Sequence, residues 1–328
     1  MFKWIKKNLT TVTLLVIFVG GLIWVYVNYI NIWLNTPKES RKYGNILIDE
    51  PSEKEYINFE NTHVSLNVEG DIGKSVNYVY NLYDIQDIYD LENVASSFGF
   101  IKGESDNFDF WDSPSGSLYL YRDHVEMNYS ADDVFFEGDS LTEDSFDTFL
   151  NKSGLSFLKD EFIFEFETGD NGFSVKCVAK IDGKVVVNDS WNSFLGEFYF
   201  GDGNKLRLIK LPRYIWKEGD YGTYAGYVAE EIPELLKTNG SDLIRSRIRW
   251  DLSDYSYDYF YRDVDFSKIN VKTYAISSVE MVYYLDVKHL KVIPILITTG
   301  YANLECNEDS EVSSGNYYLE IWIANVKS

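Results

Sequence analysis

The feature that most constrains this chain is a stretch of thirty residues, 8–37, that contains no Asp, Glu, Lys, Arg or His. Its apolar core, residues 10–34, would form about 37 Å of α-helix at roughly 1.5 Å per residue, enough to cross a hydrocarbon core about 30 Å thick. Trp and Tyr residues gather toward the C-terminal end of the stretch, as they do in an interfacial aromatic belt. The sequence therefore predicts one transmembrane helix over residues 9–34.

A cleaved signal peptide is the main alternative for this stretch. Such a peptide has an apolar core of about 7–15 residues, followed by a cleavage site made of small residues. The apolar run here is longer and the residues after it are bulky, so we expect an uncleaved anchor. The polar residues 35–57 hold two prolines and are expected to form a stalk that lifts the following region off the bilayer.

The charges that flank the span decide its orientation only weakly. Three lysines precede it, and Lys38, Arg41 and Lys42 follow it. A short charged tail is hard to export, whereas a long C-terminal region can be translocated largely regardless of its charge. We therefore expect a single-pass protein of the cell membrane, with residues 1–8 as a cytoplasmic tail and the bulk of the chain outside the cytoplasm.

The charge of this bulk region limits its partners. The whole chain carries −22, and residues 1–42 hold six basic residues and one acidic residue, which leaves −27 for residues 43–328. A surface this acidic argues against nucleic acid and anionic lipid as partners. The 26 Tyr and 21 Phe residues favour a β-rich fold, because aromatic side chains suit a pleated and half-buried surface.

Alternating apolar and polar runs predict β-strands through the rest of the chain, and turn signals between them predict hairpins. These signals are Ser113-Pro114-Ser115-Gly116, Asp170-Asn171-Gly172 and Asp182-Gly183. The region is long enough for two domains. We predict an α+β fold, with a β-rich ectodomain of antiparallel sheets and a few short helices, divided into domains at residues 58–155 and 156–328.

Three short helices are expected. Asp90 is a plausible N-cap of the first, and Gly99 its C-terminal stop. The second covers residues 142–152, with acidic residues in its first turn. The third lies within residues 227–237, where Pro233 either kinks the helix or marks its true start.

The second half of the chain resembles the YycH/YycI family of bitopic proteins, whose ectodomains are PepSY-like α+β modules. The resemblance rests on the turns Lys180-Ile181-Asp182-Gly183 and Phe200-Gly201-Asp202-Gly203, and on the late strands within residues 279–285, 292–300 and 315–324. It implies a short cytoplasmic tail, one span and a two-domain external region that restrains a cell-wall-sensing histidine kinase through membrane contacts. The family carries no catalytic residues, and Val185 stands where its pattern favours Pro.

The sequence carries no recognisable enzyme motif. The chain contains three histidines, no G-x-S-x-G motif, no P-loop and no dinucleotide-binding fingerprint. We expect no catalytic residues and no cofactor, although a hydrolase stays open because triads are spatial rather than sequential. The two cysteines, Cys177 and Cys306, could form a disulfide or remain free thiols.

No metal site is predicted. The acidic runs at residues 106–112 and 307–311 do not follow the spacing of a calcium-binding loop, and solvated charge explains them. Calcium stays open as a ligand, because clustered Asp and Asn residues can supply the oxygen atoms that it needs.

Two surfaces are candidates for binding. The first is an aromatic and acidic run that could stack on sugars or clasp a peptide, or could cover its own core: Trp250, Tyr255, Tyr257 and Tyr259. The second is one face of the predicted membrane helix, where small and amide side chains could meet another span, or where the amides could reach the headgroups: Gly20, Gly21, Trp24, Asn28 and Asn31.

The sequence therefore predicts a non-enzymatic, membrane-anchored binding or regulatory protein. Its expected partner is a membrane protein such as a sensor kinase. The alternative is a cell-envelope module that binds a glycan, a peptide or calcium.

Overall fold

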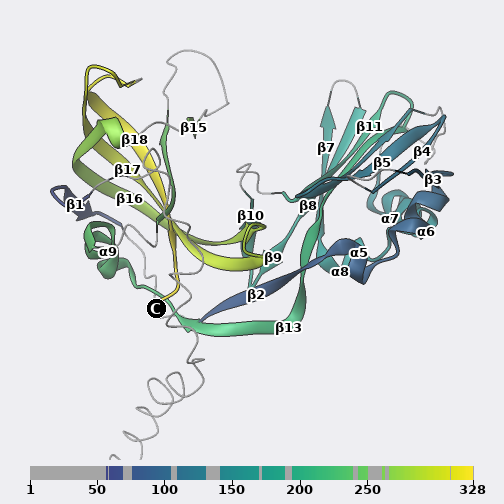
Figure 1. Ribbon diagram of the computed structural model, residues 1–328, viewed down its shortest axis with the longest axis horizontal. Helices are drawn as coiled ribbons and strands as arrows, with labels where there is room; N and C mark the ends of the chain where they lie inside the picture. The colour runs from purple at the N-terminus through teal and green to yellow at the C-terminus, as the bar shows by residue number, and fades with distance from the viewer. Residues whose placement is uncertain are drawn as a thin grey trace, which may run out of the picture. The chain divides into compact units, whose positions relative to one another are not determined.

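The computed structural model describes residues 57, 59–68, 76–104, 109–130, 141–169, 172–188, 194–238, 243–249, 261–262, 266–310 and 312–327 (Figure 1). The expected tail and span, and the stalk except for Ile57, lie outside these residues. Within the described ranges, no helix combines the length and the apolar character needed to cross a membrane. The described part is mostly β-sheet with a few short helices, and its sheets are largely antiparallel, as expected for the α+β class.

The chain divides into two compact units, each assembled from separate segments. Unit 1 contains residues up to Tyr78, Gly222–Val279 and Thr298–Ser328, and unit 2 contains Val79–Tyr221 and Glu280–Ile297. These units do not coincide with the consecutive ranges 58–155 and 156–328, because the chain passes between them four times. Each passage falls inside a strand: β2 (Val76–Asp84), β13 (Tyr214–Ala225), β16 (Ile269–Asp286) and β17 (Lys291–Cys306).

Unit 1 is built on the sheet order β15-β14-β18-β17-β16. Its further elements are β1 (His63–Leu66), the 3-10 turns η3 (Ala229–Glu231) and η5 (Phe266–Lys268), α9 (Ile232–Thr238), β14 (Leu243–Arg249), β15 (Tyr261–Arg262) and β18 (Gly315–Ala324). β1 lies parallel to β16, with Val64 opposite Tyr274. Because α9 begins at Ile232, Pro233 occupies its first turn and marks the true start of the helix.

The core of unit 1 contains a buried polar pair. The hydroxyl group of Tyr274 lies 3.1 Å from Oγ1 of Thr298, and both residues are buried. The ring of Phe59 packs at 6.0 Å from the ring of Tyr274. Gly300 lets β16 and β17 approach closely, since a Cβ atom at this position would lie 2.0 Å from the carbonyl oxygen of Ala275.

We predict that Gly300→Ala destabilises unit 1, because the added methyl group would meet backbone that cannot move without disturbing the β16–β17 contact. The expected loss is about 1–3 kcal/mol of unfolding free energy, measured by urea denaturation. Gly169→Ala is the matched control, since its nearest atom beyond its chain neighbours would be 3.8 Å away. Equal stability of the two variants would contradict the prediction.

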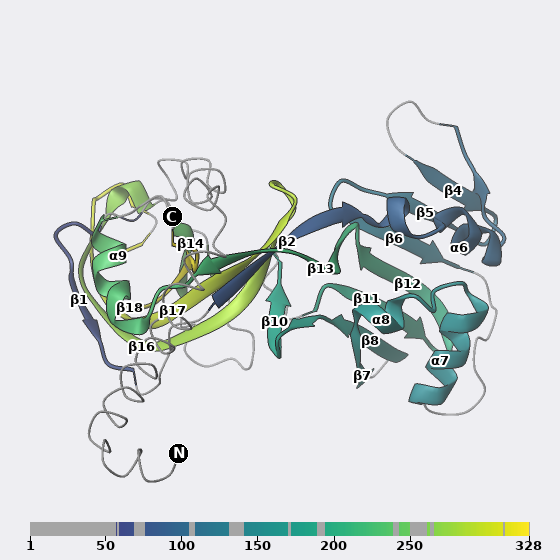
Figure 2. The same ribbon diagram turned by 90° about the horizontal axis from the view of Figure 1, so that it is seen from below.

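Unit 2 is built on an eight-stranded antiparallel sheet in the order β3-β4-β5-β6-β12-β11-β8-β7. The strands are β3 (Ile101–Lys102), β4 (Phe110–Ser113), β5 (Gly116–Leu120), β6 (His124–Tyr129), β7 (Ile163–Gly169), β8 (Gly172–Val178), β11 (Gly196–Gly201) and β12 (Lys205–Pro212). The helices are α5 (Ile85–Ile88), α6 (Leu91–Ser97), α7 (Glu143–Lys152) and α8 (Leu158–Glu161). Figure 2 shows α6, α7 and α8 lying over this sheet, and Figure 1 places them on one of its faces.

Several local predictions are confirmed in unit 2. Asp90 caps α6 by accepting a hydrogen bond of 3.0 Å from the backbone of Asn93. The helix expected at residues 142–152 is α7, with Glu143 and Asp144 in its first turn and Thr142 as its N-cap. The hairpin between β9 (Lys180–Ile181) and β10 (Lys184–Val187) turns through Asp182 and Gly183, both with positive φ. This is the conformation that an Asp-Gly turn provides.

Aromatic rings hold α7 against the sheet. Phe146 and Phe149 of α7 meet Phe198 and Phe200 of β11 edge to face, with ring centroids 5.1 Å apart for Phe146–Phe198 and 5.4 Å apart for Phe149–Phe200. All four side chains are fully buried. Successive residues of a strand point to opposite faces of the sheet. The β11 residue between Phe198 and Phe200 therefore lies on the face away from α7.

Truncating a ring in this cluster is expected to lower the free energy of unfolding of unit 2. Phe146→Ala would leave a cavity among five rings and cost about 3–5 kcal/mol, as chemical denaturation would measure. Phe166→Ala provides the control, because Phe166 is 39% exposed and contacts the same cluster at its margin. A similar loss from both variants would show that Phe146 does not hold the core.

Candidate binding face

The face of the unit 2 sheet opposite α7 carries a continuous row of paired side chains. The row consists of Phe110, Tyr119, Glu126, Lys210, Glu197, Lys176 and Glu165, each directly opposite the next across seven strands. From Glu126 onward the charges alternate in sign, and opposite charges on facing positions contribute roughly 0.2–1 kcal/mol per pair. These residues are half-buried or exposed, so we call this side the open face.

Four rings form an aromatic strip at one end of the open face: Phe110, Tyr119, Tyr121 and His124. Consecutive ring centroids lie 6.2, 5.9 and 4.7 Å apart along this order, and the first and last pairs are nearly parallel. Tyr121 is 43% exposed, whereas Leu118 and Leu120, which alternate with these tyrosines, are buried on the helix side. Phe110, Tyr119 and His124 are half-buried, so the aromatic strip presents apolar surface to solvent mainly at Tyr121.

Carboxylates surround the imidazole at the end of the aromatic strip. His124 Nδ1 lies 2.8 Å from Oδ1 of Asp123, and Nε2 lies 3.5 Å from Oε2 of Glu126. Burial raises the pKa of Asp123, but the hydrogen bond and charge of His124, with Lys210 nearby, outweigh it and leave that pKa below its usual value. This end of the aromatic strip combines a ring with negative charge.

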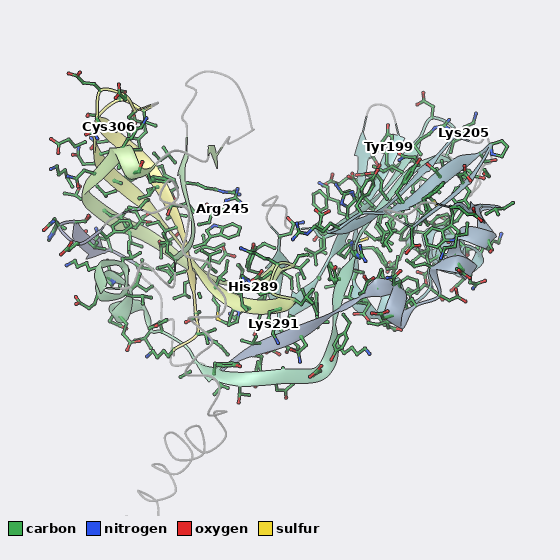
Figure 3. The ribbon with its side chains drawn as sticks, viewed as in Figure 1. Tyr199, Lys205, Arg245, His289, Lys291 and Cys306 are labelled. Atoms are coloured by element: carbon green, nitrogen blue, oxygen red, sulfur yellow. The ribbon has the colours of Figure 1, made fainter. Side chains whose placement is uncertain are left out.

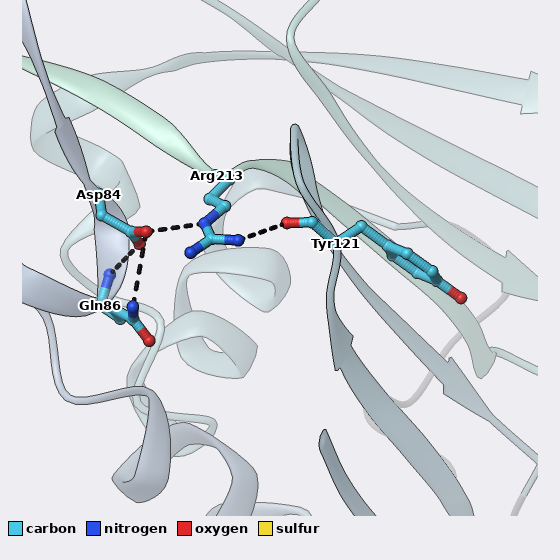
Figure 4. A network of polar contacts seen from close by, with 4 residues as sticks. All are labelled: Asp84, Gln86, Tyr121 and Arg213. Carbon is cyan, nitrogen blue, oxygen red and sulfur yellow. Dashed lines mark hydrogen bonds and ion pairs between the residues drawn. The ribbon is translucent and has the colours of Figure 1, made fainter. Parts of the chain in front are cut away.

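Arg213 fixes the backbone beneath the aromatic strip (Figure 4). Its Nη1 donates to the carbonyl oxygen of Tyr121 at 2.9 Å, and its Nε donates to Oδ2 of Asp84 at 2.7 Å. Asp84 in turn caps α5 by accepting from the backbone of Gln86 at 3.1 Å. Figure 4 shows the ring of Tyr121 extending away from the guanidinium group, so Arg213 holds the backbone of Tyr121 without covering its ring.

A second polar cluster lies where β2, β13 and β17 run within unit 2. Asp220 accepts hydrogen bonds from the hydroxyl of Tyr83 and, at 3.0 Å, from Nδ2 of Asn81, whose own Oδ1 accepts from Lys291. The hydrogen bond from Tyr83 is the main cause that lowers the pKa of Asp220, and the same bond raises the pKa of Tyr83. These groups satisfy one another at the surface.

His289 lies beside Lys291, near the turn that joins β16 to β17 (Figure 3). Its Nδ1 lies 2.7 Å from Oδ2 of Asp286, and its backbone N–H donates to the other oxygen of the same carboxylate at 3.1 Å. Both contacts close the turn. The contact between His289 and Asp286 therefore stabilises the hairpin formed by β16 and β17.

Unit 1 holds an aromatic and charged cluster on β14 and β18. Nε1 of Trp322 donates to Oε1 of Glu320 at 2.7 Å, and the guanidinium carbons of Arg245 and Arg247 lie 6.0 and 5.3 Å from the Trp322 ring centroid. Arg247, Glu320 and Trp322 are buried. Their burial indicates a structural role in holding the two strands together.

The residues singled out from the sequence as binding surfaces lie outside the described part. This holds for Trp250, Tyr255, Tyr257 and Tyr259, and for the helix face of Gly20, Gly21, Trp24, Asn28 and Asn31. Both sets stay predictions. The aromatic strip was missed, and the signal that could have found it is the alternation of aromatic residues with the buried Trp111, Leu118 and Leu120.

The remaining candidates show no reactive site in the described ranges. Cys177 is buried and Cys306 half-buried, and both are free thiols. Burial raises the pKa of the Cys177 thiol, which disfavours the reactive thiolate. No group of three or more His, Cys, Asp and Glu residues that could hold a metal ion occurs among the described residues.

Comparison with known proteins finds no family model, no curated protein and no solved structure that matches this chain. The chemistry of the open face therefore has to be read from its own residues.

We predict that Tyr83→Phe raises the pKa of Asp220 back toward its ordinary value, because the strongest hydrogen bond to the carboxylate is lost. A carboxyl group with a lower pKa in the native state than in the unfolded chain stabilises the fold at pH values above the unfolded pKa of about 3.9. This stabilisation is lost as the pH falls through the native pKa. A carboxyl-detected ¹³C titration measures the shift. Tyr301→Phe is the control, and an unchanged Asp220 titration in Tyr83→Phe would contradict the assignment.

Proposed function

We propose that this chain is a non-enzymatic, membrane-anchored binding protein that holds a partner protein outside the cytoplasm and thereby modulates a membrane protein such as a sensor kinase. The observation that carries the proposal is the aromatic strip on the open face, with its backbone fixed by Arg213. The uncharged stretch over residues 8–37 supports the anchor, and a two-domain ectodomain completes the arrangement.

The composition of the open face suits a protein partner. Aromatic residues are enriched at the centres of protein interfaces, and charged residues belong to their rims. Here four rings adjoin a row of alternating charges that runs from Glu126 to Glu165. The rings would supply desolvated contact area, and the charges would set the orientation of the partner.

The environments of the histidines support binding over catalysis. His124 and His289 contact carboxylates, and in the described part of the chain neither hydrogen-bonds a hydroxyl or thiol group that could serve as a nucleophile. An activated nucleophile needs such a contact with its base.

A glycan is the second candidate ligand, and one observation favours it. Phe110 and Tyr119 are nearly parallel, with 18° between their ring planes, and the neighbouring Tyr121 is exposed. The exposed ring of Tyr121 could stack on the apolar face of a sugar, with the half-buried pair beside it. This alternative places the ligand on the same aromatic strip.

We predict that a photo-crosslinking amino acid at Tyr121 of the full-length chain, in its native membrane, captures one discrete protein. The same probe at Glu143, exposed on the helix side of unit 2, should capture none. Adding Tyr119→Ala should weaken the Tyr121 adduct about thirtyfold, as expected for an interface residue worth about 2 kcal/mol. Mass spectrometry of the adducts is the measurement.

The same experiment separates the alternatives. An adduct that carries saccharide mass and no peptide would support the glycan. Equal labelling from Tyr121 and Glu143, or no adduct at Tyr121, would overturn binding by the open face.

A further inference from the structure

The two edges of the unit 2 sheet differ. One edge is β3, which has only two residues, and short edge strands are a common protection against unwanted pairing. The other edge is β7, which pairs with β8 over seven consecutive positions without a bulge. β8 is its only strand partner in the part of the chain that the structure describes. One long edge of the sheet is therefore regular and available for pairing.

β7 lacks several of the devices that blunt an edge strand, and its only charged residues are Glu165 and Glu167. It contains no Pro and no Lys, and Ile163 and Phe166 are 50% and 39% exposed. Phe164 and Phe166 lean on Phe146 of α7, with ring centroids 5.0 and 5.7 Å away. An added strand would cover the exposed part of Phe166 on this side of the sheet and gain apolar contact area.

The charges on β7 specify the strand that fits. Glu165 and Glu167 lie on the open face, and Glu165 ends the row in which the signs alternate: Glu126, Lys210, Glu197, Lys176 and Glu165. The next position in this row lies on the strand that would pair with β7. A cation there would continue the alternation.

β8 already shows what such a strand looks like. Its Lys176 stands opposite Glu165 and forms an ion pair of 2.6 Å with Glu167 on one face. Its Val175 and Cys177 stand opposite Phe166 and Phe164 on the other face. A partner that alternates basic and apolar residues would reproduce these contacts on the outer side of β7.

A second copy of this chain fits the edge poorly. In an antiparallel β7–β7 pair centred on Phe166, Glu165 of each copy would face Glu167 of the other. Like charges on facing positions are destabilising.

We propose that β7 is a docking edge that adds an extended segment of a partner protein, with alternating basic and apolar residues, as a ninth strand of the unit 2 sheet. Backbone hydrogen bonds would supply affinity, and the two glutamates would supply selectivity. The docking edge is separate from the aromatic strip and does not depend on the proposed function.

The test uses the full-length protein and the peptide acetyl-(Lys-Val)₄-amide as a probe. Hydrogen exchange should slow at residues 163–169 when this peptide is added, and the acidic peptide acetyl-(Glu-Val)₄-amide should have no such effect. A peptide of the same composition with four Lys followed by four Val controls for charge alone. Its effect on the exchange of residues 163–169 should be at least tenfold weaker at equal concentration.

The charge-reversed variant Glu165→Lys/Glu167→Lys should bind the basic probe at least tenfold more weakly and should now bind the acidic probe. The acquired binding shows that the variant is folded. Asp87→Lys/Asp202→Lys makes the same charge change at exposed sites elsewhere in unit 2 and should leave both affinities unchanged. Equal weakening in the two double variants, or slowed exchange spread away from β7, would overturn the proposal.

Discussion

The packing of α7 on one face of the eight-stranded sheet is the constraint on which the rest of unit 2 depends. Phe146 and Phe149 bury themselves against Phe198 and Phe200, and the alternation of strand side chains then commits every second residue to the opposite face. Among the residues that the structure describes, no helix of unit 2 covers that face with a comparable apolar cluster, and its paired residues are half-buried or exposed. The paired charges and the aromatic strip are the two groups of side chains that occupy this face.

Arg213 connects this packing to the aromatic strip. A planar guanidinium group can bond two partners in fixed directions, and here it joins the carboxylate that caps α5 to the carbonyl of Tyr121. The helix cap and the loop that carries an exposed ring are therefore positioned by the same side chain. A lysine could not reproduce both bonds, because its ammonium group lacks the planar fork.

Local chemistry made part of this fold predictable from the sequence. The cap at Asp90, the helix near residues 142–152 and the Asp182-Gly183 turn depend on neighbouring residues, and each was predicted correctly. The hairpin from Phe110 to Tyr121 was predicted as well. The pairing of β6 with β12, about 80 residues apart, has no local signal, and neither does a row of charges spread over seven strands. The aromatic strip lies within a locally paired part of the chain, but whether its face is covered depends on α7 and on the distant strands, so the strip was missed.

The segmented construction of the two units also governs how the chain can be made. His63 of β1 pairs with Thr273 of β16, so this contact waits for about 210 further residues to be synthesised. At roughly 5–20 residues per second, that delay is about 10–40 s. During it, β1 lacks its strand partner. Folding of unit 1 must therefore follow synthesis of most of the chain, and factors that shield nascent strands would set its yield.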